Sequence, residues 1–103
     1  ALAKRYIDSN YSQNITLDSL AEITHINKFY LAHSFTECVG QSPINYLTDR
    51  RLEACKGLLV SSNLSVAQVA TSVGFSSQSY FSQIFRKKTG MTPRQYRSRY
   101  ARK

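Results

Sequence analysis

The sequence has 103 residues, 42% of them hydrophobic, and a formal net charge of +8, which suits one globular domain or two very small ones. No apolar run approaches the roughly 20 residues that a membrane-spanning helix needs, and no signal peptide precedes the first predicted helix. We therefore expect a cytoplasmic protein with no membrane partner and, because the sequence does not start with methionine, a fragment of a longer chain.

The charge is unevenly distributed along the chain. Residues 1–53 carry five basic and six acidic side chains, whereas residues 54–103 carry nine basic side chains and no acidic one. A half without carboxylates attracts polyanions. Nucleic acid is therefore the leading class of partner, and an anionic membrane surface is the second. The third explanation is that the charge binds no partner and only improves solubility.

The cysteines and histidines favour no metal or catalytic site. Cys38 and Cys55 fall on the apolar sides of predicted helices, and we interpret them as small core residues rather than a disulfide or a metal pair. Their spacing fits no zinc pattern, and the chain has only two histidines. No glycine-rich phosphate loop and no nucleophile, base and acid at motif spacing are present. We therefore expect no metal, no cofactor and no enzymatic activity.

The first part of the chain predicts three helices. The first covers residues 1 to about 11, with Leu2 and Tyr6, and also Ala3 and Ile7, turned inward. Thr16 can cap a short second helix that ends near residue 24, and Asn27 can cap a third that covers about residues 28–38. The buried side of the third helix is expected to carry Leu31, Ser34, Phe35 and Cys38. Its outer side is expected to carry Phe29, Ala32, His33 and Thr36.

A long helix and a second helix pair follow. Ser42 and Pro43 begin the long helix, which runs to about Val60. The next helix, Val66 to Val73, ends before Gly74, and serines cap a helix over about residues 77–89. One side of it, which is mostly apolar, carries Phe81, Ile84, Phe85 and Lys88. Its other side carries Gln78, Ser79, Ser82, Gln83 and Arg86, which are types suited to base edges and phosphates. Pro93 begins a last helix that runs to about Tyr100.

The two helix pairs are copies of one module. Leu31, Phe35, Gly40, Pro43 and Tyr46 recur, each displaced by 50, as Phe81, Phe85, Gly90, Pro93 and Tyr96. Two copies of one module indicate one shared task. The predicted fold is all-α, with about seven helices: a helix-turn-helix subdomain at 1–41, a linker helix at 42–61 and a second subdomain at 62–103. The linker helix would span about 27 Å, a length suited to holding two reader helices in successive major grooves of a duplex.

Residues 73–97, VGFSSQSYFSQIFRKKTGMTPRQYR, resemble the signature of the AraC/XylS family of bacterial transcription regulators. The runs LAEITHINKFYLAHSF and GQSPINYL extend the resemblance over essentially the whole chain. It implies the family's DNA-binding domain, a homeodomain-like helix-turn-helix pair that binds double-stranded DNA sequence-specifically. It also implies an N-terminal sensor or receiver domain in the full protein, and RNA polymerase as a partner when the regulator is an activator.

The resemblance also implies which residues contact DNA. Base contacts would come from Phe29, Ala32 and His33 on the first reader helix and from Gln78, Ser79, Ser82 and Gln83 on the second. Phosphate contacts would come from Lys28, Thr36, Arg86, Lys87, Lys88 and Arg94. One departure from the family is His25, which stands where glycine is frequent, so a strained backbone is expected there.

One alternative stays open at this point. A basic helical module could bind RNA or anionic lipid without sequence preference, and the basic C-terminal half permits this. It does not account for the repeated helix pair.

Overall fold

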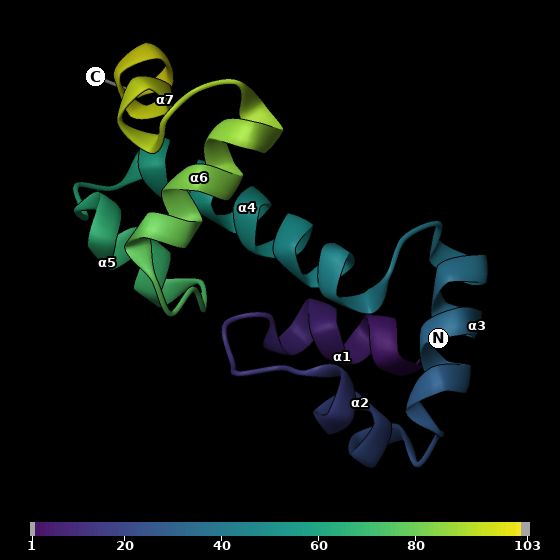
Figure 1. Ribbon diagram of the computed structural model, residues 1–103. Helices are drawn as coiled ribbons and strands as arrows, with labels where there is room; N and C mark the ends of the chain where they lie inside the picture. The colour runs from purple at the N-terminus through teal and green to yellow at the C-terminus, as the bar shows by residue number, and fades with distance from the viewer. Residues whose placement is uncertain (1, 102–103) are drawn as a thin grey trace. The chain divides into compact units, whose positions relative to one another are not determined.

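The computed structural model describes residues 2–101, which form seven α-helices and no strand (Figure 1). They are α1 Leu2–Asn10, α2 Leu17–Thr24, α3 Lys28–Val39, α4 Pro43–Ser61, α5 Val66–Ser72, α6 Gln78–Thr89 and α7 Pro93–Tyr100. The chain divides into two compact units, one ending at Arg50 and the other beginning at Arg51, so α4 contributes to both. The all-α class and the pair of helix-turn-helix modules predicted from the sequence are confirmed.

Helices of the first unit surround a small apolar core. Ile7 of α1, Leu20 of α2, Leu31 and Phe35 of α3 and Leu47 of α4 are all buried in it. On α1 the buried residues are Ala3 and Ile7, spaced i and i+4 on one side of the helix. Leu2 lies 100° around the helix from Ala3 and is 56% exposed, so the prediction that Leu2 turns inward was wrong.

A polar cluster centred on Asp8 links α1 to α4 at the edge of this core. The Tyr46 hydroxyl donates to Asp8 Oδ1 at 2.5 Å, and Arg50 Nε donates to the same oxygen at 3.1 Å. Lys4 Nζ lies 3.3 Å from Asp8 Oδ2. The Tyr46 hydrogen bond, aided by the two cations, lowers the pKa of Asp8 below its ordinary value. The folded first unit therefore favours the ionised carboxylate.

A row of packed aromatic rings runs through the core of the second unit, among buried aliphatic side chains. Phe81 lies 5.2 Å from Phe75 and 5.6 Å from Phe85, measured between ring centroids. The Phe85 ring in turn meets Tyr96 of α7 edge-on at 5.5 Å, a favourable aromatic geometry. Since both phenylalanines of α6 are fully buried, they fix the rotation of α6 about its own axis.

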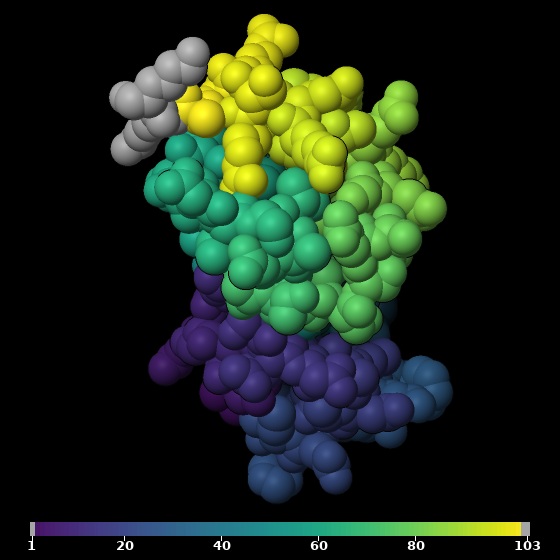
Figure 2. Space-filling model, turned by 90° about the vertical axis from the view of Figure 1, so that its left-hand side faces the viewer, coloured from purple at the N-terminus to yellow at the C-terminus, as the bar shows by residue number. Residues whose placement is uncertain are grey.

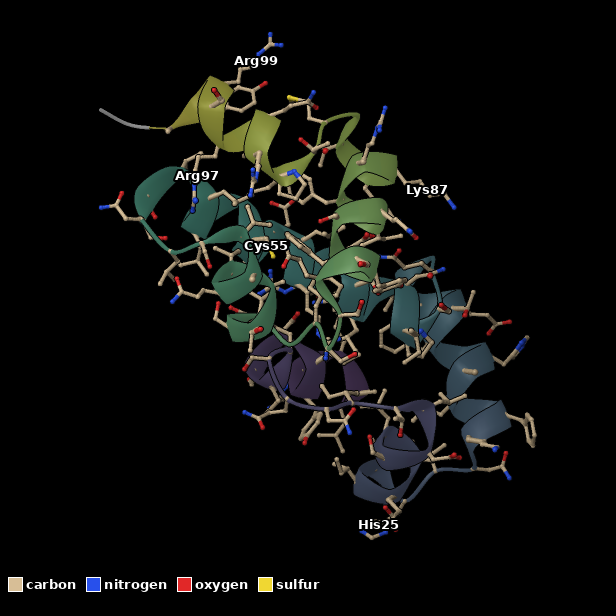
Figure 3. All side chains as sticks on the ribbon, turned by 60° about the vertical axis from the view of Figure 1, so that its left-hand side comes forward. His25, Cys55, Lys87, Arg97 and Arg99 are labelled. Carbon is tan, nitrogen blue, oxygen red and sulfur yellow. The ribbon has the colours of Figure 1, made fainter. Side chains whose placement is uncertain are left out.

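The two cysteines have different surroundings. Cys55 lies inside the second unit (Figure 3), and burial raises the pKa of its thiol to about 12, so this residue is the small core side chain that we predicted. Cys38 is exposed, so the prediction of a core position was wrong for it. It lies in the last turn of α3, beside a groove that the first unit leaves open.

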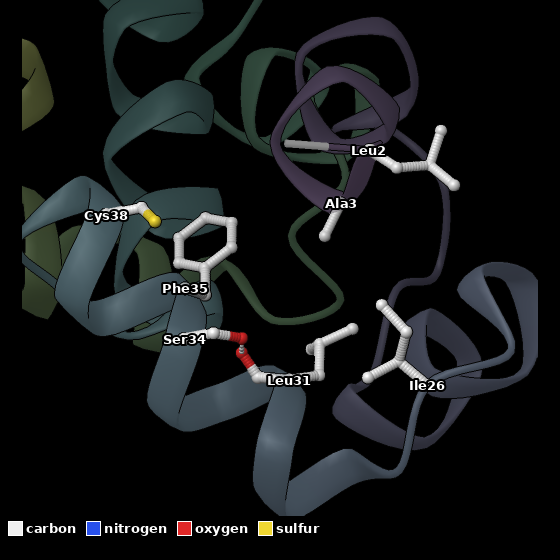
Figure 4. Close-up of a pocket in the computed structure, with 7 residues that line it drawn as sticks. All are labelled: Leu2, Ala3, Ile26, Leu31, Ser34, Phe35 and Cys38. Carbon is white, nitrogen blue, oxygen red and sulfur yellow. Dashed lines mark hydrogen bonds between the residues drawn. The ribbon is translucent and has the colours of Figure 1, made fainter.

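This groove lies between the first turn of α1 and the inner side of α3 (Figure 4). It encloses about 100 Å³, and its lining is almost entirely apolar: Leu2, Ala3, Ile26, Leu31, Ser34, Phe35 and Cys38. The second module has Phe81 and Ile84 where the first has Leu31 and Ser34. The smaller residues of the first module thus account for the open space.

Arg97 ties α7 to the end of α4 within the second unit (Figure 3). Its Nε donates to the backbone oxygen of Leu59 at 2.9 Å, in the last turn of α4. A cation at a helix C-terminus satisfies a carbonyl that has no partner within the helix, and it also interacts favourably with the helix dipole. Arg97 is therefore a structural residue of the second unit.

Replacing Asp8 by Asn should lower the free energy of unfolding by about 1 kcal/mol at pH 7, allowing for the partial exposure of the carboxylate. Because the folded-state pKa of Asp8 is lowered, its contribution is fully present above the unfolded-state pKa of about 4 and disappears as the pH falls through the folded-state value. Urea unfolding at pH 7 and pH 3 measures this. Glu22→Gln, at an exposed carboxylate of the same unit, is the control, and an Asp8→Asn effect as large at pH 3 as at pH 7 would contradict the assignment.

The groove predicts a pair of opposite stability changes. Ser34→Ile should fill apolar space and raise the free energy of unfolding by about 1 kcal/mol, whereas Ile84→Ser in the second module should lower it by a similar amount. Chemical denaturation of both variants measures the changes. Destabilisation by Ser34→Ile would show that the groove is too narrow for the added side chain.

Candidate nucleic-acid interface

Each helix pair is joined by a tight turn whose geometry follows from its sequence. Ile26 N–H donates to Ala21 O at 3.2 Å, and Phe75 N–H donates to Ala70 O at 3.0 Å, so both turns close with the same hydrogen bond. This bond needs a left-handed residue just before it. In the second module that residue is Gly74, with φ of 107°.

In the first module the left-handed residue is His25, with φ of 57° (labelled in Figure 3). Among residues 2–101 it is the only residue other than glycine with a positive φ. The strained backbone predicted at His25 is confirmed, and the turn nevertheless has the same hydrogen bond as its glycine-containing counterpart. The first module therefore keeps its helix-turn-helix geometry at a cost in local strain.

The second helix of each pair begins at a strong cap. Asn27 Oδ1 accepts from Phe29 N–H at 2.9 Å at the start of α3, and Ser77 Oγ accepts from Tyr80 N–H at 3.2 Å at the start of α6. Both α3 and α6 contain 12 residues and end at a left-handed glycine, Gly40 or Gly90. The two reader helices are therefore of equal length and begin and end at corresponding positions.

Burial sets which side of each reader helix faces out. Leu31 and Phe35 are buried on α3, and Phe81 and Phe85 occupy the corresponding positions on α6. Residues spaced i and i+4 lie on one side of a helix, so burying such a pair leaves the opposite side exposed. In Figure 2 the light green surface of α6 lies on the outside of the second unit, and the blue surface of α3 lies on the outside of the first.

The exposed side of α6 carries small and amide groups without intramolecular partners. Gln78, Ser79 and Gln83 are exposed and Ser82 is half-buried. Within residues 2–101 none of these four side chains makes a hydrogen bond. Their donors and acceptors are thus available to a ligand, as the sequence predicted for base-contacting residues.

Four predicted phosphate-contacting cations of the second unit are exposed. Arg86, Lys87 and Lys88 lie in the last turn of α6, and Arg94 lies in the first turn of α7. Lys87 extends away from the unit in Figure 3. The C-terminal turn of α6 and the N-terminal turn of α7 thus place positive charge beside the polar side of α6.

The corresponding side of α3 differs in character. Phe29 is 74% exposed, Ala32 is half-buried, and His33 and Thr36 are exposed. His33 Nε2 lies 3.0 Å from Glu37 Oε1, one turn further along α3. Thr36 Oγ1 donates to Ala32 O at 2.8 Å. The predicted residues of the first reader helix are therefore together on its outer side, but its two polar groups already have partners.

Lys28 is more constrained than a free phosphate-binding lysine. Its Nζ lies 3.2 Å from Asp18 Oδ1 of α2 and 5.5 Å from the centroid of the Phe29 ring. The His33–Glu37 pair was recognisable from its i, i+4 spacing, and the sequence interpretation missed it. The Lys28–Asp18 pair joins two helices, so no local spacing could have revealed it.

Among residues 2–101 no cluster of three or more His, Cys, Asp or Glu side chains could hold a metal ion. None of the described helices, the 19-residue α4 included, is long and apolar enough to cross a membrane.

Comparison with known proteins agrees with this geometry. A family described as a helix-turn-helix domain, of AraC/XylS type, matches residues 20–99. The chain belongs to the AraC/XylS-type helix-turn-helix family. The family's function is DNA binding in transcription regulation.

Family members of known structure share the whole fold. The C-terminal domain of AraT, a response regulator from Geobacillus stearothermophilus, superposes with a TM-score of 0.95 at 36% identity, over 99% of this chain and 85% of that one. The similarity thus includes both helix pairs.

Two Bacillus subtilis proteins are also similar in sequence. The uncharacterised regulator YobQ is 40% identical over 90% of this chain, and the bifunctional transcriptional activator and DNA repair enzyme AdaA is 34% identical over 93%. The chain spans 39% of YobQ and 46% of AdaA, so it corresponds to less than half of either relative.

The strained turn gives a prediction specific to this AraC/XylS-type chain. His25→Gly should raise the free energy of unfolding by about 0.5–1 kcal/mol, because relief of the left-handed strain exceeds the added entropy of the unfolded chain. The reciprocal Gly74→His should lower it by about 1 kcal/mol or more. Thermal unfolding of both variants measures the changes, and a destabilising His25→Gly would show that His25 is not strained.

Proposed function

We propose that this chain binds double-stranded DNA sequence-specifically as part of a bacterial transcription regulator, with α3 and α6 as reader helices in successive major grooves. The observation that supports this most directly is the matched burial of Leu31 with Phe35 and of Phe81 with Phe85. The same side of two equal helices is thereby left exposed. A helical bundle whose outer surface only faced water would not need α3 and α6 to bury residues at corresponding positions.

Hydrogen bonding by α6 supplies part of the sequence preference. A glutamine amide can donate and accept in one plane and so pairs with the N6 and N7 edge of adenine. Gln78 and Gln83 are exposed, and both lack intramolecular partners among the described residues. Ser79 and Ser82 add hydroxyl groups that can contact any base with a donor or acceptor in the major groove.

The cations around α6 orient the protein on the duplex. Phosphate contacts fix register and carry no direct sequence information. We assign this role to Arg86, Lys87, Lys88 and Arg94, which border the polar side of α6. On α3 we assign base contacts to Phe29, Ala32 and His33 and phosphate contacts to Lys28 and Thr36. The unequal charge makes the second unit the stronger anchor.

The full protein is proposed to add a sensor or receiver domain before this chain and to contact RNA polymerase when it activates. The first part is supported by the greater length of YobQ and AdaA and by AraT, whose matching region is the C-terminal domain of a response regulator. We assign no reaction to this chain, although the name of AdaA includes a repair enzyme. A role on bacterial DNA would place the protein in the cytoplasm.

Two substitutions on α6 separate base reading from phosphate binding. Gln83→Ala should relax the preference at one position of the selected site, with a loss of about 1–3 kcal/mol of discrimination. Lys87→Ala should weaken binding to all duplexes alike and reduce the salt dependence by about one counterion. Site selection from a random duplex library, followed by titration at several salt concentrations, measures both.

The control for charge is Lys56→Ala, since Lys56 of α4 pairs with Glu53 at 3.1 Å. It should change neither the selected site nor the salt dependence. An unchanged site preference in Gln83→Ala would contradict its assignment. Equal affinity for random duplex, RNA and anionic vesicles would contradict the proposed function itself.

A further inference from the structure

The two reader helices offer different chemistry at corresponding positions. A displacement of 50 pairs each outward residue of α3 with one of α6. The pairs are Phe29 with Ser79, Ala32 with Ser82, His33 with Gln83, and Thr36 with Arg86. Every residue of this set on α6 is polar or charged, whereas two of those on α3 are apolar.

The polar groups on the outer side of α3 are engaged within the helix. His33 Nε2 lies 3.0 Å from Glu37 Oε1, and the Thr36 hydroxyl donates a hydrogen bond to Ala32 O. By contrast, the side chains of Ser79, Gln83 and Arg86 make no hydrogen bond or ion pair with other residues in 2–101. Apolar surface is therefore what α3 offers most readily to a base.

Phe29 supplies most of that apolar surface. Phe29 is 74% exposed in the first turn of α3, the highest exposure among the large hydrophobic residues in 2–101. The Lys28 ammonium group lies 5.5 Å from the ring centroid and is itself held 3.2 Å from Asp18 of α2. The ring is thus supported from one side before any ligand binds, which lowers the entropy lost on binding.

The floor of the major groove has one apolar group in unmodified DNA, the C5 methyl of thymine. We propose that α3 recognises thymine through this methyl group, with Phe29 as the specificity-determining residue and Ala32 beside it. This inference rests on the proposed function. The two modules then read by different means, α3 by apolar contact and α6 by hydrogen bonds, and the site is chemically asymmetric.

Deoxyuridine tests this directly, because it lacks only the methyl group and keeps every hydrogen-bonding group of thymine. The probe is the duplex that this chain selects from a random library, with each thymine replaced by deoxyuridine in turn. We expect an affinity loss of about three- to fivefold, the value for one buried methyl group, at one or two thymines in one half of the site. Replacements in the other half should have little effect.

Variants assign the effect to a side chain. In Phe29→Ala the thymine and uracil duplexes should bind equally, whereas Phe29→Leu, which keeps apolar surface, should retain part of the difference. Ser79→Ala, at the corresponding position of α6, should retain the full difference. Circular dichroism confirms the fold of each variant, and because Phe29 and Ser79 are both exposed, no loss of fold is expected.

Different outcomes overturn different parts. If a motif is selected and no deoxyuridine replacement weakens binding, the inference fails and the proposed function stands. The inference also fails, and the proposed function stands, if the affinity difference between the thymine and deoxyuridine duplexes persists in Phe29→Ala or disappears in Ser79→Ala. If no motif is enriched at all, the proposed function fails and the inference fails with it.

Discussion

The burial of one i, i+4 pair on each reader helix is the constraint on which the rest of the structure depends. Leu31 with Phe35 and Phe81 with Phe85 hold α3 and α6 at one rotation about their own axes. Each buried side chain of this size is worth about 1.5–3 kcal/mol, far more than any surface contact on the same helices. The outer residues are free to vary in chemistry because the inner ones alone fix the orientation.

Much of the fold followed from local sequence rules. Thr16, Asn27, Ser77 and Thr92 each cap a helix with a side-chain hydroxyl or amide oxygen, and Pro43 and Pro93 begin helices as their fixed φ requires. The two errors concern the first unit. Leu2 and Cys38 were placed in the core by periodicity, but both border the groove next to Ser34, where the first module lacks the bulk that Ile84 gives the second. Periodicity identifies a side of a helix and does not show whether a neighbour covers it.

The candidate interface was predictable in outline and not in its polar detail. The outward positions of both reader helices follow from 100° per residue, and the structure groups them as expected. The partners of those residues did not follow. Asp18 lies ten residues before Lys28, and the cluster of Tyr46 and Arg50 on Asp8 joins residues about 40 positions apart. Such pairs depend on how helices pack, which no spacing within one helix encodes.

The attachment of Arg97 to the end of α4 has a consequence for the electrostatics of the acid-free half. Nine cations occur after residue 53, and a simple count would credit all of them to a polyanion. Arg97 instead neutralises the negative pole of α4, with Nε on the oxygen of Leu59. The number of basic residues in this half is thus larger than the number that can neutralise phosphates and release counterions from a duplex. On the proposed assignment Arg97 releases no ion, so fewer ions are released on association than the basic residues of this half would suggest.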